Sequence, residues 1–150
     1  MNIDLSEIDT VIISHGLNDH GGALRSFLQV NTKAKIYVQR SAFKRHYSKF
    51  LFFLVNIGLY DSLEIHPQVI LVDGNMKNDD ELSLYIVDND SKWYSNANDL
   101  LYEGHHKDHL RHEQTLVVRE DRTAVIIGCG YSGIVNIMDK AASYNPQVCV

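Results

Sequence analysis

Two histidines and an aspartate lie close together in a glycine-rich stretch near the amino terminus, SHGLNDHGG at residues 14–22. His15, Asp19 and His20 offer the nitrogen and oxygen donors that Zn²⁺ and Fe²⁺ bind in proteins, and that Mn²⁺ binds in more oxygen-rich sites. The alternative is a polar turn with two hydrogen-bonded histidines. A histidine pair alone would favour that alternative, whereas Asp19 and the flanking glycines favour present or former metal ligands.

The elements on either side must position this stretch. Residues 10–13, TVII, predict a buried strand because all four side chains are β-branched. Residues 22–30 predict a helix that carries Leu24, Phe27 and Leu28 on one face. A short loop between a strand and a helix is where α/β folds place reactive groups, since rigid elements hold the loop on both sides.

The rest of the chain predicts further strands and helices of an α/β fold. Strands are expected at residues 35–38, 68–72, 83–87, 114–119, 123–127 and 147–150, and helices at residues 41–49 and 134–143. Ser41 is the predicted N-cap of the first of these helices. The apolar residues 50–59 fit either a helix or a strand. Residues 88–112 predict a long, polar, irregular segment, which in a compact domain is usually functional or mobile.

That polar segment contains four histidines, namely His105, His106, His109 and His112. His109 and His112 are spaced i, i+3 and could share a helix face. A solvated polar loop is the favoured interpretation, because no cysteine or carboxylate spacing there matches a known metal site. The segment could still fold over the His15 loop, which keeps these histidines as secondary candidates.

A second glycine-rich loop, GCGYSG at residues 128–133, matches the G-x-G-x-x-G spacing of dinucleotide-binding proteins. Two observations argue against that use. The preceding strand is predicted to lie in an antiparallel hairpin, whereas a dinucleotide-binding loop opens a parallel βαβ unit. The ribose-binding acid is expected about 20 residues further on, and the chain ends before a second strand is complete. Ser132 is a poor nucleophile candidate, because the G-x-S-x-G motif fails at its last position. Cys129 is either a reactive thiol or, as we prefer, a small buried residue at a tight turn.

Composition excludes several classes of protein. The 150 residues are 45% hydrophobic and carry a net charge of −5. No basic stripe is present, so a nucleic-acid partner is not expected. The longest apolar run, residues 50–55, is far shorter than a membrane span, and no apolar signal segment is visible at the amino terminus. With only 2 cysteines there is no disulfide framework, and we expect a reducing, cytoplasmic compartment.

The two glycine-rich loops together resemble signatures of the metallo-β-lactamase superfamily. SHGLNDHGGAL is similar to its H-x-H-x-D-H motif, and GCGYSGIVNI is similar to the G-C-x-H-x-G segment of one branch. That branch comprises metal-dependent hydrolases that look like the dihydropterin–ribofuranosylaminobenzene phosphate synthases. The resemblance implies an αββα domain with a mixed sheet. It further implies that residues 1–150 form a single, truncated domain without the first strands and the last metal-binding histidine.

The resemblance also implies roles for individual residues. His15 matches a ligand of the first metal site, and Asp19 and His20 match ligands of the second. In intact relatives the two metals hold and acidify a water molecule that attacks a carbonyl or phosphorus centre of a small substrate. Asp19 would be the catalytic residue, because it orients that water or receives its proton.

Two positions depart from the pattern of the superfamily. Leu17 stands in place of the second histidine of the first motif, and Tyr131 stands in place of the histidine of the second. Leucine offers no lone pair and a neutral tyrosine is a weak ligand. Zn²⁺, Fe²⁺ or Mn²⁺ would therefore bind tightly only if His15, Asp19 and His20 converged on one ion.

These departures predict a protein of this fold whose hydrolase activity is impaired or absent, with a metal bound weakly or not at all. The alternative is a degenerate, non-catalytic binding or assembly module. In that case copies of the chain would pair through a sheet edge that the missing strands leave exposed. A nucleotide-binding module that uses residues 128–133 is a third, weaker hypothesis.

Overall fold

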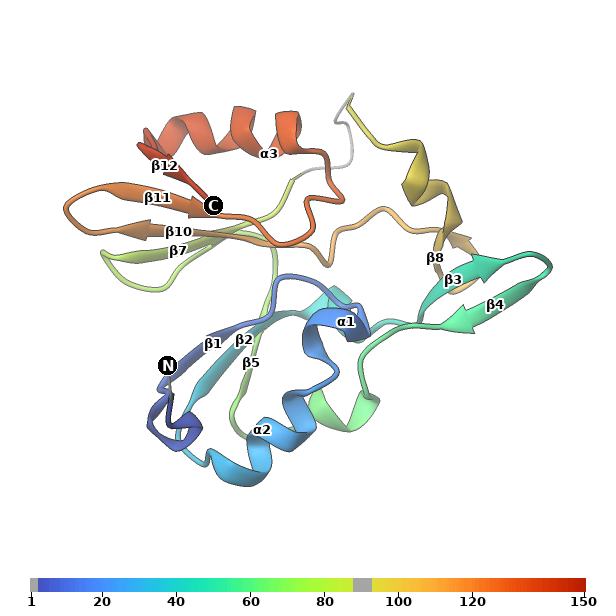
Figure 1. Ribbon diagram of the computed structural model, residues 1–150, viewed down its shortest axis with the longest axis horizontal. Helices are drawn as coiled ribbons and strands as arrows, with labels where there is room; N and C mark the ends of the chain where they lie inside the picture. Colours follow the sequence, from blue (N-terminus) through green and yellow to red (C-terminus); the bar gives the residue numbers. More distant parts are fainter. Residues whose placement is uncertain (1–2, 88–92) are drawn as a thin grey trace.

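A computed structural model of the chain describes residues 3–87 and 93–150, and its strands form three sheets (Figure 1). The first sheet is parallel and has the order β1-β2-β5. Its strands are β1 (Thr10–Ile12), β2 (Lys35–Gln39) and β5 (Val69–Val72). The three predicted strands of this sheet are confirmed, but β1 is an edge strand and only partly buried, so the prediction of a buried strand there is wrong.

The second sheet is mixed and has the order β12-β11-β10-β7-β6. Its strands are β6 (Met76–Lys77), β7 (Leu82–Tyr85), β10 (Thr115–Arg119), β11 (Thr123–Ile126) and β12 (Val148–Cys149). β10 and β11 form the predicted antiparallel hairpin. However, β11 also pairs in parallel with β12. Since α3 (Ile134–Ala141) joins these two strands, the prediction that β11 would not open a parallel βαβ unit is wrong.

Helices cover the outer face of each of these sheets (Figure 1). α2 (Leu24–Val30) packs on the first sheet, and the residues buried there include Leu24, Ile36 and Val38. α3 packs on the second sheet, and the residues buried there include Val117, Val125 and Ile137. Tyr37, Val72 and Leu84 lie between the two sheets. This helix–sheet–sheet–helix order confirms the predicted α/β class with an αββα arrangement.

A third, smaller sheet projects from one side, with the order β4-β3-β8-β9. Its strands are β3 (His46–Phe50), β4 (Phe53–Asn56), β8 (Leu101–Glu103) and β9 (His106–Lys107). The predicted helix at residues 41–49 is therefore wrong. Only Arg40–Phe43 is helical, as a short 3₁₀ helix, and the Ser41 hydroxyl donates to the Arg111 carbonyl instead of capping a helix. Pairing between Tyr47 and Tyr102 favours the strand over the local helix signal.

The segment at residues 88–112 is more ordered than predicted. Residues 88–92 lie outside the described part of the chain. Residues 93–112 contain a 3₁₀ helix at Asn96–Leu100 as well as β8 and β9. Within the described residues, no helix has the length and apolar character needed to cross a membrane.

A buried polar network joins the two central sheets. The side-chain amide of Gln114 donates to the carbonyls of Ile13 and Tyr37, at 2.7 and 3.1 Å. The Gln39 amide donates to Gln114 Oε1 at 3.0 Å, and the backbone N–H of Gln114 donates to the Ser14 carbonyl at 2.7 Å. These bonds hold the start of β10 against the ends of β1 and β2, where the first glycine-rich stretch begins.

Candidate metal centre

The first glycine-rich stretch leaves β1 and turns directly into α1 (Asn18–Gly21), so Asp19 and His20 lie in a helical turn and not in a loop. Gly16 makes this path possible. A Cβ at Gly16 would lie 2.7 Å from both the Cα and the carbonyl oxygen of Ala42, which no other residue could accept without displacement. The fully buried His15 ring lies against the ring of His20, with 4.1 Å between the centroids.

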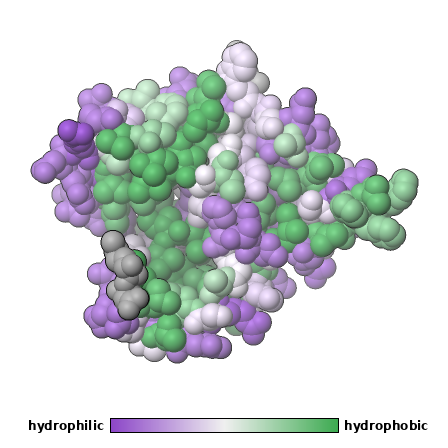
Figure 2. Space-filling model, viewed as in Figure 1, coloured by the Kyte–Doolittle hydropathy of each residue, from purple (hydrophilic) through white to green (hydrophobic). Residues whose placement is uncertain are grey.

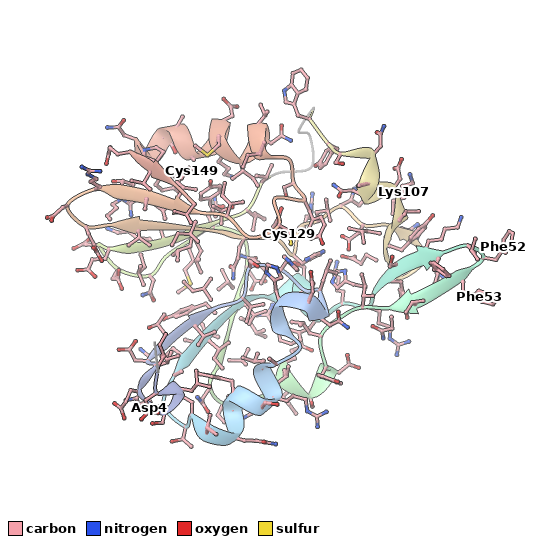
Figure 3. The ribbon with its side chains drawn as sticks, viewed as in Figure 1. Asp4, Phe52, Phe53, Lys107, Cys129 and Cys149 are labelled. Atoms are coloured by element: carbon pink, nitrogen blue, oxygen red, sulfur yellow. The ribbon has the colours of Figure 1, made fainter. Side chains whose placement is uncertain are left out.

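The second glycine-rich loop, between β11 and α3, reaches the same place. A Cβ at Gly128 would lie 2.7 Å from the Cβ of Ser14, so the two loops touch. This contact places Cys129 at the centre of the molecule (Figure 3), with its Sγ 3.3 Å from His20 Nε2. Cys129 is exposed, so the preferred prediction of a buried cysteine is wrong.

Four side chains with metal-binding groups converge here. His15, Asp19, His20 and Cys129 each offer one ligand atom, and these atoms all lie within 4.8 Å of one another. His15 Nε2 is buried and has no hydrogen-bond partner among the described residues. An unpaired buried nitrogen costs about 1–3 kcal/mol. A divalent cation within this group of donors would satisfy it once the ring proton moves to Nδ1, so the residues present fit a metal ion.

The protonation of His15 agrees with a role as ligand. Burial lowers the pKa of His15 to about 4, with a further contribution from the nearby His20 and against the opposing effect of Asp19. The imidazole is therefore neutral near pH 7, which is the form that binds metals. The backbone N–H of Leu17 donates to Nδ1 at 3.2 Å, so the ring proton lies on Nε2. Ligation through Nε2 requires that proton to move to Nδ1, which breaks the contact with Leu17.

His20 is oriented by a hydroxyl group. Ser14 Oγ lies 2.7 Å from His20 Nδ1. We assign the ring proton to Nδ1, which then donates to Ser14 and leaves the Nε2 lone pair facing Cys129. A hydrogen bond of this kind to the outer nitrogen fixes the tautomer of metal-binding histidines.

The two substituted positions contribute no ligand in this arrangement. Leu17 is only 3% exposed and forms an isolated β-bridge with Gly58, so it is part of the packed interior. The Tyr131 ring meets the His15 ring edge-on at 5.3 Å. Burial raises the pKa of Tyr131 to about 12, so its phenol is neutral at physiological pH. The expectation that these positions lack metal ligands agrees with the geometry.

A buried carboxylate holds the second loop. Glu113 accepts hydrogen bonds from the backbone N–H groups of Tyr131 and Ser132, at 2.9 and 2.6 Å. In a nucleotide-binding loop such amides face a phosphate. Here a carboxylate occupies them, and its negative charge would repel a phosphate. This contact argues against a nucleotide site even though the loop opens a βαβ unit.

A second cluster of buried groups lies next to the first. Asp108 Oδ2 accepts from His46 Nδ1 at 2.7 Å and from His112 Nε2 at 3.1 Å. Burial would raise the pKa of Asp108, but the hydrogen bonds from His112 and His46 prevail and hold it well below its usual range. His112 Nδ1 accepts from the backbone N–H of Gly16 at 2.9 Å, which ties this cluster to the first glycine-rich stretch.

This second cluster has the composition of a metal site, but its donor atoms are already used. His46 Nε2 faces the Ser41 carbonyl at 3.1 Å and His46 Nδ1 faces Asp108 at 2.7 Å, so both ring nitrogens of His46 already have partners. Asp108 Oδ1 accepts from the Leu110 N–H at 2.7 Å. We therefore assign the cluster a structural role, as a buried ion pair that supports the loop containing Gly16.

The remaining histidines lie in different surroundings. His112 folds against His15, with 6.3 Å between ring centroids, as the secondary hypothesis proposed. His105, His106 and His109 are exposed, as the favoured interpretation of this segment predicted. His46 was not singled out from the sequence. The only local signal for the cluster was the i, i+4 spacing of Asp108 and His112.

Comparisons with known proteins bear on the fold and the site together. Neither a protein-family profile nor a curated protein matches the sequence. A solved crystal structure does match, that of a metal-dependent hydrolase of the β-lactamase superfamily, with a TM-score of 0.70 and 27% sequence identity. The chain has the fold of that superfamily.

The match covers 92% of this chain and 54% of the hydrolase, so the chain spans about half the length of that protein. The similarity supports the resemblance to the superfamily that the two loop motifs indicated. The narrower branch, the truncation and the roles of His15, Asp19 and His20 stay predictions.

Proposed function

We propose that this chain is a metal-dependent hydrolase whose centre holds one divalent cation between His15, Asp19 and His20. The observation that carries the proposal is the buried Nε2 of His15, which no described residue hydrogen-bonds, within a group whose ligand atoms all lie within 4.8 Å of one another. In intact relatives, by the resemblance, these residues divide between two metals. Here the ligand atoms lie within 4.8 Å of one another, so one ion could contact all three if these separations contracted by about 1 Å.

The bound ion would activate a water molecule that attacks the carbonyl carbon or phosphorus atom of a small ester or phosphorylated substrate. Asp19 is exposed beside the buried His15, so its carboxylate can orient that water and accept its proton. His15 contributes a neutral imidazole, and Ser14 keeps the Nε2 lone pair of His20 directed at the site. Zn²⁺ suits this mixture of nitrogen and oxygen donors, with Fe²⁺ or Mn²⁺ as alternatives.

We further propose that turnover is slow compared with that of a relative with two metals. Leu17 and Tyr131 remove two of the ligands that the superfamily motifs supply, which leaves His15, Asp19, His20 and Cys129 as the donors at this centre. The 2 free cysteines and the lack of a described membrane-spanning helix are consistent with a cytoplasmic hydrolase.

Metal content tests this proposal. Wild-type protein incubated with Zn²⁺ and then desalted should retain about one ion per chain, because three donors converge. His15→Ala should lose the ion together with the hydrolysis of a chromogenic phosphodiester. His106→Ala is the matched control, since His106 is exposed on β9, and it should retain both. A folded wild-type protein without metal, or a His20→Ala variant with unchanged metal content, would contradict the proposal.

An assembly module is the second candidate, and one surface of the molecule favours it. The β3–β4 hairpin projects from the domain and ends in Phe52 and Phe53, which point away from the body of the molecule (Figure 3). Their exposed fractions are 93% and 71%, and the neighbouring Phe50 and Leu51 are also exposed. The projection carries apolar surface in Figure 2. β4 and β1 are both edge strands, so each presents backbone groups to which a second copy of the chain could bind.

A further inference from the structure

We propose that Cys129 is the fourth ligand of this metal centre and takes the place of the histidine that Tyr131 replaces. The inference rests on the proposed metal centre and adds a thiolate to it. Cys129 and Tyr131 lie two residues apart in one loop, so a change of ligand between them requires no change of fold. The thiol is already in the group of ligand atoms that lie within 4.8 Å of one another.

The distances fit tetrahedral coordination. A tetrahedral Zn²⁺ with bonds of about 2.0–2.3 Å separates its ligand atoms by roughly 3.3–3.7 Å. Cys129 Sγ and His20 Nε2 are 3.3 Å apart, so this edge of the tetrahedron is already formed. The remaining separations, at most 4.8 Å, need to contract by about 1 Å. Asp19 and Cys129 are exposed, so both side chains have room to move toward the ion.

The surrounding residues favour Cys129 over Tyr131 as the donor. Glu113 holds the backbone of Tyr131 and Ser132, and the Tyr131 ring packs edge-on against His15. The contact between Gly128 and Ser14 places Cys129 directly opposite the nitrogen of His20 that Ser14 leaves unprotonated.

The proton balance of binding is simple. In the metal-free protein the Cys129 thiol donates its proton toward His20 Nε2. If a divalent ion bound, that proton would leave to solvent and the His15 ring proton would move from Nε2 to Nδ1. The Cys129 thiolate and the Nε2 lone pairs of His15 and His20 would then be free to hold the ion. No oxidant or reductant takes part. A thiolate donor shifts the preference of the site toward Zn²⁺, Co²⁺ and Cd²⁺ and away from Mn²⁺ and Mg²⁺.

Substitution of Co²⁺ for the native ion tests the proposal without any assay of activity. A Co²⁺–thiolate bond produces a charge-transfer band in the near ultraviolet, whereas Co²⁺ bound by nitrogen and oxygen alone gives only visible d–d bands. We expect the wild-type protein to show both kinds of band. Cys129→Ser should lose the charge-transfer band, keep the d–d bands, and bind Co²⁺ more than about tenfold more weakly, since loss of even an outer-shell partner costs that much.

Cys149→Ser is the matched control, because Cys149 lies on β12 with its Sγ 3.6 Å from Met138 Sδ, on the α3 side of the second sheet. It should behave as the wild-type protein does. Bound Co²⁺ without a charge-transfer band in the wild-type protein would overturn the role of Cys129 and leave the proposed hydrolase centre standing. A folded wild-type protein that binds no Co²⁺ would overturn both proposals. Circular dichroism of each variant shows whether it is folded.

Discussion

At the scale of single residues, His15 is the side chain on which the proposed centre depends most directly. Its ring is completely buried, and its Nε2 has no hydrogen-bond partner among the described residues. If this position required only packing, an apolar residue would give a more stable fold, because burial of an unpaired nitrogen is costly. The histidine is explained if a ligand completes its interactions.

The first prediction concerns the stability of the metal-free protein at acidic pH. Burial keeps the pKa of His15 at about 4 in the folded state, compared with 6.5 for an ordinary histidine. As the pH falls below 6.5, His15 in the unfolded chain binds a proton, whereas His15 in the folded chain binds one only near pH 4. Stability is therefore fully present above about pH 6.5 and falls by about 3 kcal/mol as the pH decreases to about 4.

Urea unfolding at several pH values across this window measures the effect. His15→Gln is the control, because it keeps a polar side chain of similar size but cannot be protonated. The other histidines are the same in both proteins, so the difference in slope belongs to His15. Equal slopes in the two proteins would show that the folded state accepts a proton on His15 as readily as the unfolded state does.

At the scale of elements, the site is made where three chain segments meet at the ends of strands. β1 leads into the stretch with His15, β11 leads into the loop with Cys129, and the segment before β10 supplies His112 and Glu113. Rigid strands hold each segment at one end. Side chains such as Glu113 then set the path of the backbone at the other.

The second prediction therefore concerns Glu113→Gln. An amide oxygen can accept from one of the two N–H groups that Glu113 now binds, but the buried NH₂ group then faces the other donor. We expect a loss of about 1–3 kcal/mol in the free energy of unfolding. Hydrogen exchange of the Tyr131 and Ser132 amides should become faster, which locates the loss in this loop.

Glu120→Gln provides the comparison, since Glu120 is exposed in the turn between β10 and β11. It should change stability by less than about 0.5 kcal/mol. Unchanged protection of the Tyr131 and Ser132 amides in Glu113→Gln would mean that Glu113 does not hold the second loop.

At the scale of the whole molecule, the two candidate functions use different parts of the structure. The proposed metal centre lies between the two central sheets, near Cys129. The third sheet extends away from them and ends in the apolar β3–β4 hairpin (Figure 1). The hairpin can therefore be altered without a direct effect on the metal ligands.

The third prediction is that copies of this chain associate through the hairpin. Light scattering over a range of concentrations should show dimers that dissociate on dilution. The double substitution Phe52→Ser and Phe53→Ser should weaken association by more than tenfold, since each buried aromatic anchor contributes about 1–2 kcal/mol. Ile65→Ser is the control, because Ile65 is 87% exposed but lies outside the hairpin. A monomer at all concentrations would contradict the assembly function.

Much of the fold could be predicted from local sequence patterns. The β-branched run at residues 10–13, the hairpin at residues 114–127 and the amphipathic segment after Gly133 all formed as expected, because each pattern matches the period of its element. The strand β3 was missed. Ser41 carries a genuine helix-start signal, and pairing with β4 and with the distant β8 favours a strand there.

The candidate site was predictable to the extent that it is contiguous in sequence. The spacing of His15, Asp19 and His20 within one glycine-rich stretch was sufficient to single them out, and Leu17 was recognisable there as the departure from the motif. Cys129, His46 and the buried contacts of Asp108 were not predictable, because their roles depend on which segments meet in space. No local sequence pattern indicates that a loop 109 residues away brings the Cys129 thiol against His20.

The sequence by itself determined the class of fold and the chemistry of the first loop, because both follow from neighbouring residues. Only the tertiary structure decided how many ligands converge, which buried nitrogen lacks a partner, and which histidines are held by Asp108 instead of facing a metal. These properties depend on close contacts between residues far apart in the chain, such as Gly16 with Ala42 and Gly128 with Ser14. Packing of the two sheets creates those contacts, and the proposed metal centre exists only where they form.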